Sequence, residues 1–339
     1  MPPAPQNSQE IQLKSRPDGE PRDADFELVE TPLAEPGSGE LLVRNVYMSV
    51  DPYMRGRMRD VVSYVPPFAL GEVMQGGTVG KVEVSNHPDF AVGDYVNSGF
   101  GWRDYFTSNG EGLGKIDPSL APLTQYLGVL GGTGFTAYVG LLDLMDPQEG
   151  ETVFVSGAAG AVGLITGQLA KIRGCRVVGS AGSDEKVDRL QREFGYDAAF
   201  NYKTDNLDDA LSRTCPDGIE IYFDNVGGDH LQAALDHMKD FGRISACGAI
   251  SLYNLEDPEP GPNNLSQIVR KRLTIKGFIV SDHAERRADF QRDMLRWLGE
   301  GEVIDHETIV DGLNNAPQAF MGLFKGENVG KMLVRIGDE

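Results

Sequence analysis

The chain has 339 residues, 40% of them hydrophobic, with 31 Lys and Arg against 51 Asp and Glu. That length is more than one hydrophobic core usually holds and predicts two domains, while the formal charge of −20 disfavours binding to a phosphate backbone. No run approaches the roughly 18 apolar residues that cross a bilayer, and the N-terminus offers no apolar signal segment, so we expect a cytoplasmic protein that binds neither membrane nor nucleic acid.

The first third of the chain predicts short β-strands separated by glycine-rich turns. Extended runs at 40–46, 76–84 and 92–96 are rich in β-branched residues and interrupted by Gly. Many short strands at close spacing predict a partly closed β-barrel. Residues 1–24 and the acidic, Pro-rich stretch 256–263 are expected to be loose segments.

After residue 150, strand-like runs alternate with helical segments. The expected strands, each followed by its helix, are Thr152–Ser156 with 161–173, Arg176–Ser180 with 184–194, Ala198–Tyr202 with 205–214, and Ile219–Asp224 with 229–239. Further strands are expected at Arg243–Cys247 and Leu273–Val280, followed by a helix at 284–299. This alternation predicts an α/β domain with a parallel, doubly wound sheet. A last strand at 330–336 is expected to return to the first domain.

The turn after the first of these strands has the pattern of a dinucleotide-binding loop. Ala158 stands at the first Gly position of the fingerprint, and Gly160 and Gly163 stand at the second and third. Gly160 lets backbone approach a pyrophosphate, Gly163 lets the helix pack on the strand, and the helix N-terminus offers free N–H groups. The context of strand, loop, helix and following strand favours a cofactor site over an ordinary Gly-rich turn.

The end of the second strand favours NADP(H) over NAD(H). An NAD site usually has a carboxylate there for the ribose 2′-hydroxyl, but residues 178–183 contain none. Asp184 and Glu185 follow, at the start of the next helix, and Lys186 then offers a charge for a 2′-phosphate. An exposed helix lysine is the alternative interpretation of Lys186.

Several common reaction types lack their residues. None of the eleven Tyr is followed by Lys four positions on, which excludes the catalytic pair of short-chain dehydrogenases. Residues 1–150 contain no Cys and one His, His87, so we expect no catalytic zinc there and no metal site. The three Cys of the chain are far apart, which argues against disulfides and thiolate metal sites. Ser156 lacks the flanking Gly pattern of a nucleophile elbow.

Six segments in order along the chain resemble the medium-chain dehydrogenase/reductase superfamily. Within it, the sequence is similar to the zinc-independent NADPH-dependent double-bond reductases, the group of prostaglandin reductase (leukotriene B4 dehydrogenase), bacterial curcumin reductase and plant alkenal reductases. The segments that carry the match are Ser49–Arg55, Gly157–Gly163, Phe200–Lys203, Phe223–Gly228, Cys247–Asn254 and Glu327–Lys331.

The resemblance implies a fold, a reaction and a domain division. It implies a GroES-like, partly open β-barrel domain at 1–127 and 307–339, and a Rossmann NADP-binding domain at 128–306. The implied reaction is hydride transfer from NADPH to the β-carbon of an α,β-unsaturated ketone or aldehyde, with stabilisation of the enolate and no metal. The resemblance also implies a homodimer.

The resemblance also assigns site residues, position by position. Tyr253 would donate a hydrogen bond to the developing enolate oxygen; the alternative is that it is a partly buried aromatic residue of a loop. Tyr53 would face the substrate from the first domain; the alternative is that it is an aromatic residue of the core. Asn225, otherwise a turn residue, would contact the cofactor. The remaining cofactor contacts implied are Gly160, Ala161, Val162, Gly163, Lys186, Tyr202, Cys247, Gly248, Ala249, Ile250, Ser251, Tyr253, Phe278, Ile279, Val280 and Asn328.

Two other functions stay open at this point. A quinone reductase of the same superfamily would share the fold and the cofactor. A non-catalytic structural protein would keep the NADPH-binding loop but would reduce no substrate. The presence of both Tyr253 and Asn225 argues against this function.

Overall fold

The computed structural model describes residues 5–257 and 259–339. The chain divides into two compact units, the first formed by Met1–Leu127, Glu307–Glu327 and Lys331–Glu339, and the second by Gly128–His306 and Asn328–Gly330. Each unit is described by itself below. In the described part of the chain, no helix has both the length and the apolar character needed to cross a membrane.

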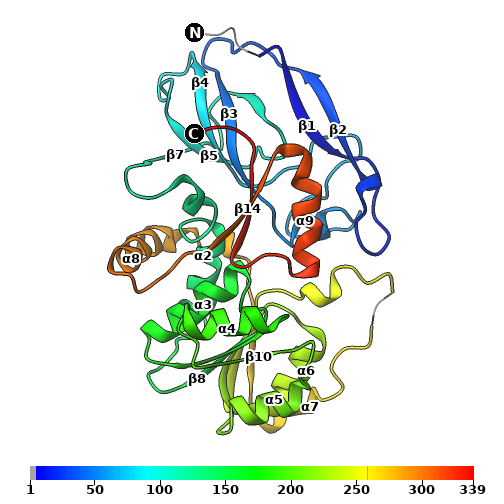
Figure 1. Cartoon of the computed structure of the whole chain (residues 1–339), viewed down its shortest axis with the longest axis vertical. Coiled ribbons are helices and arrows are strands. Elements are labelled where there is room, and N and C mark those ends of the chain that lie inside the picture. Colours follow the sequence, from blue (N-terminus) through cyan, green and yellow to red (C-terminus); the bar gives the residue numbers. More distant parts are fainter. Residues whose placement is uncertain (1–4, 258) are drawn as a thin grey trace. The chain divides into compact units, whose positions relative to one another are not determined.

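The second unit is built on a six-stranded parallel sheet (Figure 1). Its strands are β8 (Thr152–Val155), β9 (Arg176–Ala181), β10 (Ala198–Asn201), β11 (Ile219–Asp224), β12 (Met238–Ala246) and β13 (Thr274–Gly277). They lie in the order β10-β9-β8-β11-β12-β13, and every neighbouring pair is parallel. The strand order reverses between β8 and β11, which is the point where such sheets bind ligands beyond their carboxyl ends.

Helices α3 (Ala161–Ile172), α4 (Asp184–Arg192), α5 (Leu207–Thr214), α6 (Gly228–His237) and α7 (Ser266–Arg270) connect these parallel strands. Helix α2 (Gly132–Tyr138) precedes the first of them, and α8 (Arg287–Glu300) follows the last. Leu211 of α5 and Leu235 of α6 share one core cluster with Phe154 and Tyr222 of the sheet. The aromatic rings of Phe154 and Tyr222 stack at 5.0 Å. A doubly wound α/β fold is therefore confirmed for this part of the chain.

The first unit is a curled, mostly antiparallel sheet. Its strands are β3 (Leu41–Ser49), β4 (Thr78–Ser85), β5 (Tyr95–Ser98), β6 (Tyr105–Ser108), β7 (Gly114–Ile116), β14 (Glu307–Asp311) and β15 (Lys331–Arg335). Strand β3 pairs with β4, β6 and β15, and its register with β4 shifts twice. Strand β4 pairs along one edge of β3, whereas β6 pairs with residues 41–44 and β15 with residues 47–49 of the other edge. The register shifts bend β3, which helps to close the sheet partly into a barrel. The GroES-like expectation is thereby confirmed.

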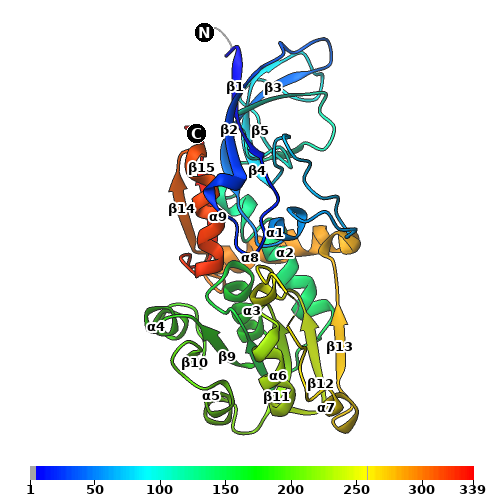
Figure 2. The same cartoon turned by 90° about the vertical axis from the view of Figure 1, so that its right-hand side faces the viewer.

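Two short helices complete the first unit. Helix α1 (Met54–Arg57) follows β3, and α9 (Ala316–Lys325) precedes the last strand. Helix α9 lies beside β15 (Figure 2). Phe320 and Met321 of α9 are buried in a cluster with Met332 and Val334 of β15 and with Trp102. The returning strand expected at 330–336 is confirmed as β15.

The N-terminal region departs from the sequence expectation. Residues 7–13 were expected to be loose, but they form strand β1 (Asn7–Leu13), which pairs along its whole length with β2 (Phe26–Pro32). Ile11 and Leu13 are 1% and 0% exposed, so burial of these side chains holds the strand in place. Residues 1–4 lie outside the described residues.

Two further boundaries differ in the second unit. The strand expected at Leu273–Val280 stops at Gly277, because its partner β12 ends at Ala246, opposite Gly277. Strand β12 begins at Met238 instead of Arg243. Its register with β11 is irregular, and this interrupts the alternation of side chains by which a strand is recognised in a sequence. In the loose stretch at 256–263, Pro258 lies outside the described residues, and its neighbours form neither helix nor strand.

Candidate functional site

The loop between β8 and α3 depends on two glycines. Gly157 has φ +60°, in the left-handed region that glycine adopts without strain. At Gly163, an added Cβ would lie 2.5 Å from the carbonyl oxygen of Gly157 and 2.7 Å from the Cα of Ala158. Helix α3 therefore packs directly on the loop backbone. Its first N–H groups, at Ala161 and Val162, have no partner inside the helix and suit a pyrophosphate.

The segment Asn328–Gly330 lies against this loop and belongs to the same unit. The N–H of Gly330 donates to the carbonyl oxygen of Ala159 at 2.9 Å, and Gly330 forms an isolated bridge with Gly160. Asn328 is buried, and its Nδ2 donates to the carbonyl oxygen of Gly330 at 2.7 Å. The expected cofactor residues Gly160 and Asn328 are therefore brought together from distant parts of the chain.

A cluster of basic and phenolic side chains follows strand β9. A Cβ at Gly182 would lie 3.1 Å from the Tyr202 hydroxyl and 3.2 Å from Cε of Lys203, so both side chains reach this turn. Ser183 caps the N-terminus of α4, and its side chain accepts the N–H of Lys186 at 3.3 Å. Burial, and then the charge of Lys203, lower the pKa of Lys186. A bound phosphate would relieve this repulsion between two lysines.

The acidic residue nearest this turn has its own partner. Asp184 accepts a hydrogen bond from Nδ2 of Asn201 at 2.8 Å. The cluster of Lys186, Tyr202 and Lys203 therefore has the charge and the donors to hold the 2′-phosphate of NADP(H), and the assignment of Lys186 to that phosphate stays a prediction.

A buried carboxylate organises the end of β11. Oδ1 of Asp224 accepts the hydroxyl of Tyr222 at 2.7 Å and the N–H groups of Val226 and Gly227 at 3.0 and 2.8 Å. Burial raises the pKa of Asp224. Nδ2 of Asn225 donates to the carbonyl oxygen of Ser156 at 2.8 Å. Asn225 therefore ties the end of β11 to the start of the phosphate loop.

The expected nicotinamide loop, Cys247–Tyr253, folds back over this turn. The N–H groups of Cys247 and Gly248 both donate to the carbonyl oxygen of Asp224 at 3.0 Å. The hydroxyl oxygen of Tyr253 accepts the N–H of Ala249 at 3.2 Å. Burial raises the pKa of Tyr253, and it raises the pKa of the Cys247 thiol to about 12. Both groups therefore stay protonated at neutral pH, and Tyr253 can act as a donor.

Ile250 and Ser251 continue the same contact with the β11 turn. Their N–H groups donate to the carbonyl oxygens of Asn225 and Val226, each at 3.2 Å, and Oγ of Ser251 also donates to Val226 at 2.6 Å. The half-buried residues Phe278–Val280 directly follow β13. Parallel strands bring their carboxyl ends to one edge of the sheet, so the expected cofactor residues share that edge.

Tyr53 belongs to the other unit. It immediately precedes α1 and is 39% exposed. Burial of its hydroxyl, followed by the charge of Asp51, raises the pKa of Tyr53, which keeps it protonated.

Family models match both units. A model described as the N-terminal domain of oxidoreductase matches residues 9–116, and one described as zinc-binding dehydrogenase matches residues 161–300.

Curated relatives match almost the full length of the chain. The NADPH-dependent curcumin reductase of Escherichia coli is 46% identical over 96% of this chain and 96% of its own length. The NADP(+)-dependent 2-alkenal reductase of Nicotiana tabacum is 45% identical over 98% of each. The crystal structure of CurA from Vibrio vulnificus in complex with NADPH superposes with a TM-score of 0.93, at 44% identity over 98% of this chain and 100% of that one.

The chain belongs to the NADPH-dependent double-bond reductases of the medium-chain dehydrogenase/reductase superfamily. Sequence reasoning overlooked two residues of this double-bond reductase. Lys203 was part of a matching segment, but its charge was not assigned to the phosphate cluster. His230 packs on Tyr202 with ring centroids 5.0 Å apart. Only the position of Lys203 beside Tyr202 could have signalled its place in the cluster, since the contact of His230 depends on folding.

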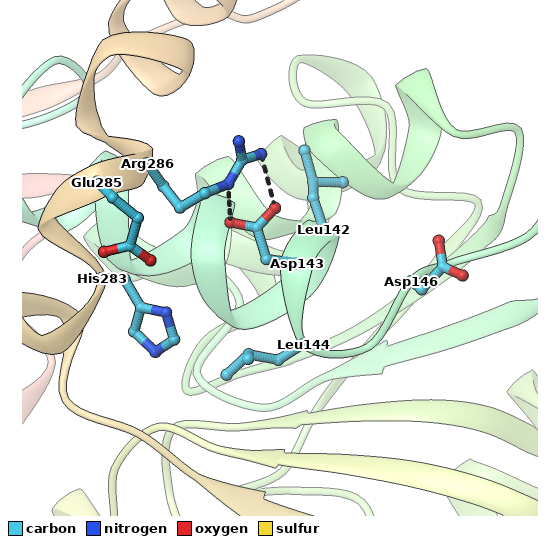
Figure 3. Close-up of a pocket in the computed structure, with 7 residues that line it drawn as sticks. All are labelled: Leu142, Asp143, Leu144, Asp146, His283, Glu285 and Arg286. Carbon is cyan, nitrogen blue, oxygen red and sulfur yellow. Dashed lines mark hydrogen bonds and ion pairs between the residues drawn. The ribbon is translucent and has the colours of Figure 1, made fainter.

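A separate cavity of the reductase has a volume of about 540 Å³ (Figure 3). It lies in the second unit and is lined by Leu142, Asp143, Leu144, Asp146, His283, Glu285 and Arg286. Arg286 donates from two nitrogens to the two carboxylate oxygens of Asp143, at 3.0 and 2.9 Å. None of the expected site residues lines this cavity, and its one guanidinium is already neutralised.

Proposed function

We propose that this reductase reduces the carbon–carbon double bond of α,β-unsaturated ketones and aldehydes with NADPH. Its relatives carry this activity in their names, as curcumin reductase and 2-alkenal reductase, and a neighbouring structure holds NADPH. The observation that carries the cofactor assignment is the cluster of Lys186, Tyr202 and Lys203 at the end of β9, where an NAD site would have a carboxylate.

The chemistry is divided between the cofactor and the chain. NADPH, when bound, supplies the hydride that adds to the β-carbon. Negative charge then develops on the substrate's carbonyl oxygen, and a proton is added at the α-carbon. We assign stabilisation of that oxygen to the phenols of Tyr253 and Tyr53, since a donor aimed at developing charge in a dry site contributes a few kcal/mol. The absence of Cys and the single His in residues 1–150 support a reaction without zinc.

The first experiment measures loss of NADPH absorbance with an alkenal, an enone, a quinone and a saturated aldehyde. Oxidation with the enone or alkenal, none with the saturated aldehyde, and a saturated carbonyl product would support the proposal. Consumption with the quinone alone would indicate a quinone reductase instead. Tight NADPH binding without any turnover would indicate a structural NADPH-binding protein.

Replacement of Tyr253 tests the proposed donor. We expect Tyr253→Phe to lower kcat by about 100-fold while the NADPH Kd changes by less than about twofold, because the donor acts on charge that develops in the transition state. Tyr126→Phe, which removes a phenol that donates to Asp117 in the other unit, is the matched control. Unchanged turnover of Tyr253→Phe would remove this residue from the mechanism.

Replacement of Lys186 tests the phosphate cluster. We expect Lys186→Ala to weaken NADPH binding about tenfold or more and to leave NADH binding within about twofold, since only NADPH has the 2′-phosphate. Lys325→Ala, at an exposed position of the other unit, controls for loss of one charge. Equal losses for both cofactors would contradict the assignment. Fluorescence titration measures both affinities.

The homodimer and the cytoplasmic location remain predictions. The dimer is supported by β13, whose four residues are exposed and which forms the edge of its sheet (Figure 2). An exposed edge strand can pair with another chain. Light scattering after gel filtration should give the mass of a dimer for the unsubstituted protein and a smaller mass for Ile275→Lys. The control variant Ile309→Lys, at a similarly exposed position of β14, should keep the dimer mass. A monomer mass for the unsubstituted protein would overturn the dimer.

A further inference from the structure

His230 is a polar side chain that is buried with one ring nitrogen unpaired. It lies in the first turn of α6 with 5% of its surface exposed, and its Nε2 has no hydrogen-bond partner among the described residues. A buried polar atom without a partner costs free energy, and a leucine at this position would avoid that cost. Burial lowers the pKa of His230 to about 4, so the ring is uncharged at neutral pH. The contact that this ring makes is therefore what accounts for a histidine here.

The imidazole of His230 packs on the phenol of Tyr202 in the same unit. The ring centroids lie 5.0 Å apart and the ring planes are inclined by 75°, an edge-on arrangement that aromatic rings favour. Tyr202 is 38% exposed, and its backbone N–H donates to the carbonyl oxygen of Ala181 at 3.1 Å. That bond ties the residue to the end of β9 but leaves both side-chain torsions free. Packing against His230 restricts these torsions.

In this orientation the hydroxyl of Tyr202 reaches the turn after β9. A Cβ at Gly182 would lie 3.1 Å from that hydroxyl and 3.2 Å from Cε of Lys203. Burial raises the pKa of Tyr202, so the phenol keeps its hydrogen and can donate it. A phenol donor beside the ammonium groups of Lys186 and Lys203 suits a phosphate.

The backbone that carries His230 is itself anchored. Helix α6 begins after Gly227, whose N–H donates to Oδ1 of the buried Asp224 at 2.8 Å. Gly227 and Gly228 have φ +71° and +52°, so the chain turns sharply from β11 into the helix. The N–H of His230 then donates to the carbonyl oxygen of Gly227 at 3.1 Å. The imidazole is therefore a firm support against which Tyr202 can be held.

We propose that His230 is a positioning residue that fixes the Tyr202 ring, so that the phenol donates to the 2′-phosphate of NADP(H) and favours this cofactor over NAD(H). This inference rests on the proposed function. His230 acts through Tyr202 because its Nε2 is buried and its ring is uncharged, so it brings no charge of its own to the phosphate. Without the imidazole the phenol can rotate away from the turn, and only a ligand with a 2′-phosphate loses a contact.

Fluorescence titration with NADPH and NADH tests this positioning role. We expect His230→Leu to raise the NADPH Kd by about fivefold or more and to leave the NADH Kd within about twofold. His230→Phe, which restores an aromatic ring, should keep both affinities within about twofold. His237→Leu is the matched control, because His237 is the last residue of the same helix and contacts Asp208. Equal losses for both cofactors in His230→Leu, or the same loss in His230→Phe, would overturn the proposal.

A double-mutant cycle shows whether His230 acts through Tyr202. We expect Tyr202→Ala to weaken NADPH binding by about fivefold or more, and His230→Leu to add less than about twofold in that background. The same loss from His230→Leu in both backgrounds would contradict the proposal, because His230 would then act without the phenol.

A measurement on the unsubstituted protein covers the case in which His230→Leu does not fold. The chain has five His, so in protein labelled with carbon-13 at the histidine Cε1 the His230 resonance can be identified by its loss in His230→Phe. At saturation, this resonance should differ between the NADP⁺ and NAD⁺ complexes, whereas the His237 resonance should not. An identical His230 resonance in both complexes would overturn the coupling to the 2′-phosphate.

These readouts also separate this inference from the proposed function. Equal affinity of the unsubstituted protein for NADPH and NADH would refute the cofactor assignment of the proposed function. A clear NADPH preference that His230→Leu leaves unchanged would refute only the role of His230. Loss of that preference in His230→Leu, in a protein that reduces no enone or alkenal, would support the role of His230 and refute the proposed reaction.

Discussion

His230 lies in α6 with 5% of its surface exposed, and its ring contacts the ring of Tyr202 edge-on. Burial lowers the pKa of His230 to about 4, against which the charge of Asp229 acts only weakly. The imidazole is therefore neutral in the folded protein at neutral pH and packs as an aromatic side chain. Its position beneath Tyr202 stabilises the phenol that we assign to the cofactor phosphate.

The pKa of His230 predicts an acid-sensitive contribution to stability. The unfolded chain takes up this proton near pH 6.5 and the folded chain only near pH 4, so stability is lost as the pH falls through this window. Between pH 7 and pH 5 the loss should be about 2 kcal/mol. We expect His230→Phe to reduce this pH dependence of the unfolding free energy by that amount in urea titrations. An equal pH dependence in both proteins would contradict the assignment.

At the scale of elements, the contact between α3 and its preceding loop depends on the absence of a side chain at Gly163. Backbone atoms of Gly157 and Ala158 occupy the space that a Cβ would need, and backbone cannot rotate away as a side chain can. At Gly299, near the end of α8, no atom lies within 4 Å of an added Cβ. The two helix glycines therefore offer a matched comparison.

We expect Gly163→Ala to weaken NADPH binding by about tenfold or more, because α3 must move away from the phosphate loop. Gly299→Ala should leave binding unchanged and stabilise the protein by about 0.5 kcal/mol or more, since alanine has the higher helix propensity. Fluorescence titration and thermal melts measure the two effects. The same NADPH affinity in both variants would show that the loop tolerates a methyl group.

The predicted elements that proved correct are those whose pattern is local. The alternation of β8, α3, β9, α4, β10, α5 and β11 follows from periodicity within each segment. Strand β1 was missed because Ile11 and Leu13 are the only apolar residues of its segment, and their packing with Phe26, Met48 and Trp102 holds the segment as a strand. Strand β12 was placed too late because Phe241, with φ +63°, interrupts its pleat.

At the scale of the whole molecule, the charge of −20 is distributed along the chain and repels itself. Salt screens such repulsion, with a Debye length of about 10 Å at 0.1 M. We expect the melting midpoint to rise by roughly 3 °C between about 0.05 and about 0.5 M KCl, with sorbitol of equal osmolality as the control. A midpoint that does not rise with KCl would count against charge repulsion as a determinant of stability.

The sequence by itself predicted the two-domain organisation, the fold class and the family, and it favoured the NADP(H) cofactor and double-bond reduction over their alternatives. These follow from local patterns: the hydrophobic period within a segment, the glycine spacing of one loop, and short matching segments in order. The segments Ser49–Arg55 and Glu327–Lys331 were recognised in this way before any contact between them was known.

Only the tertiary structure decided which of these residues act together. It joined Asp51 to Lys331 across the chain, placed Lys203 with Lys186 at one turn, and packed His230 on Tyr202. A hydrogen bond or a desolvated charge depends on distances of a few ångströms between groups that are far apart in the chain. No spacing along the sequence encodes those distances, because the packing of whole elements sets them.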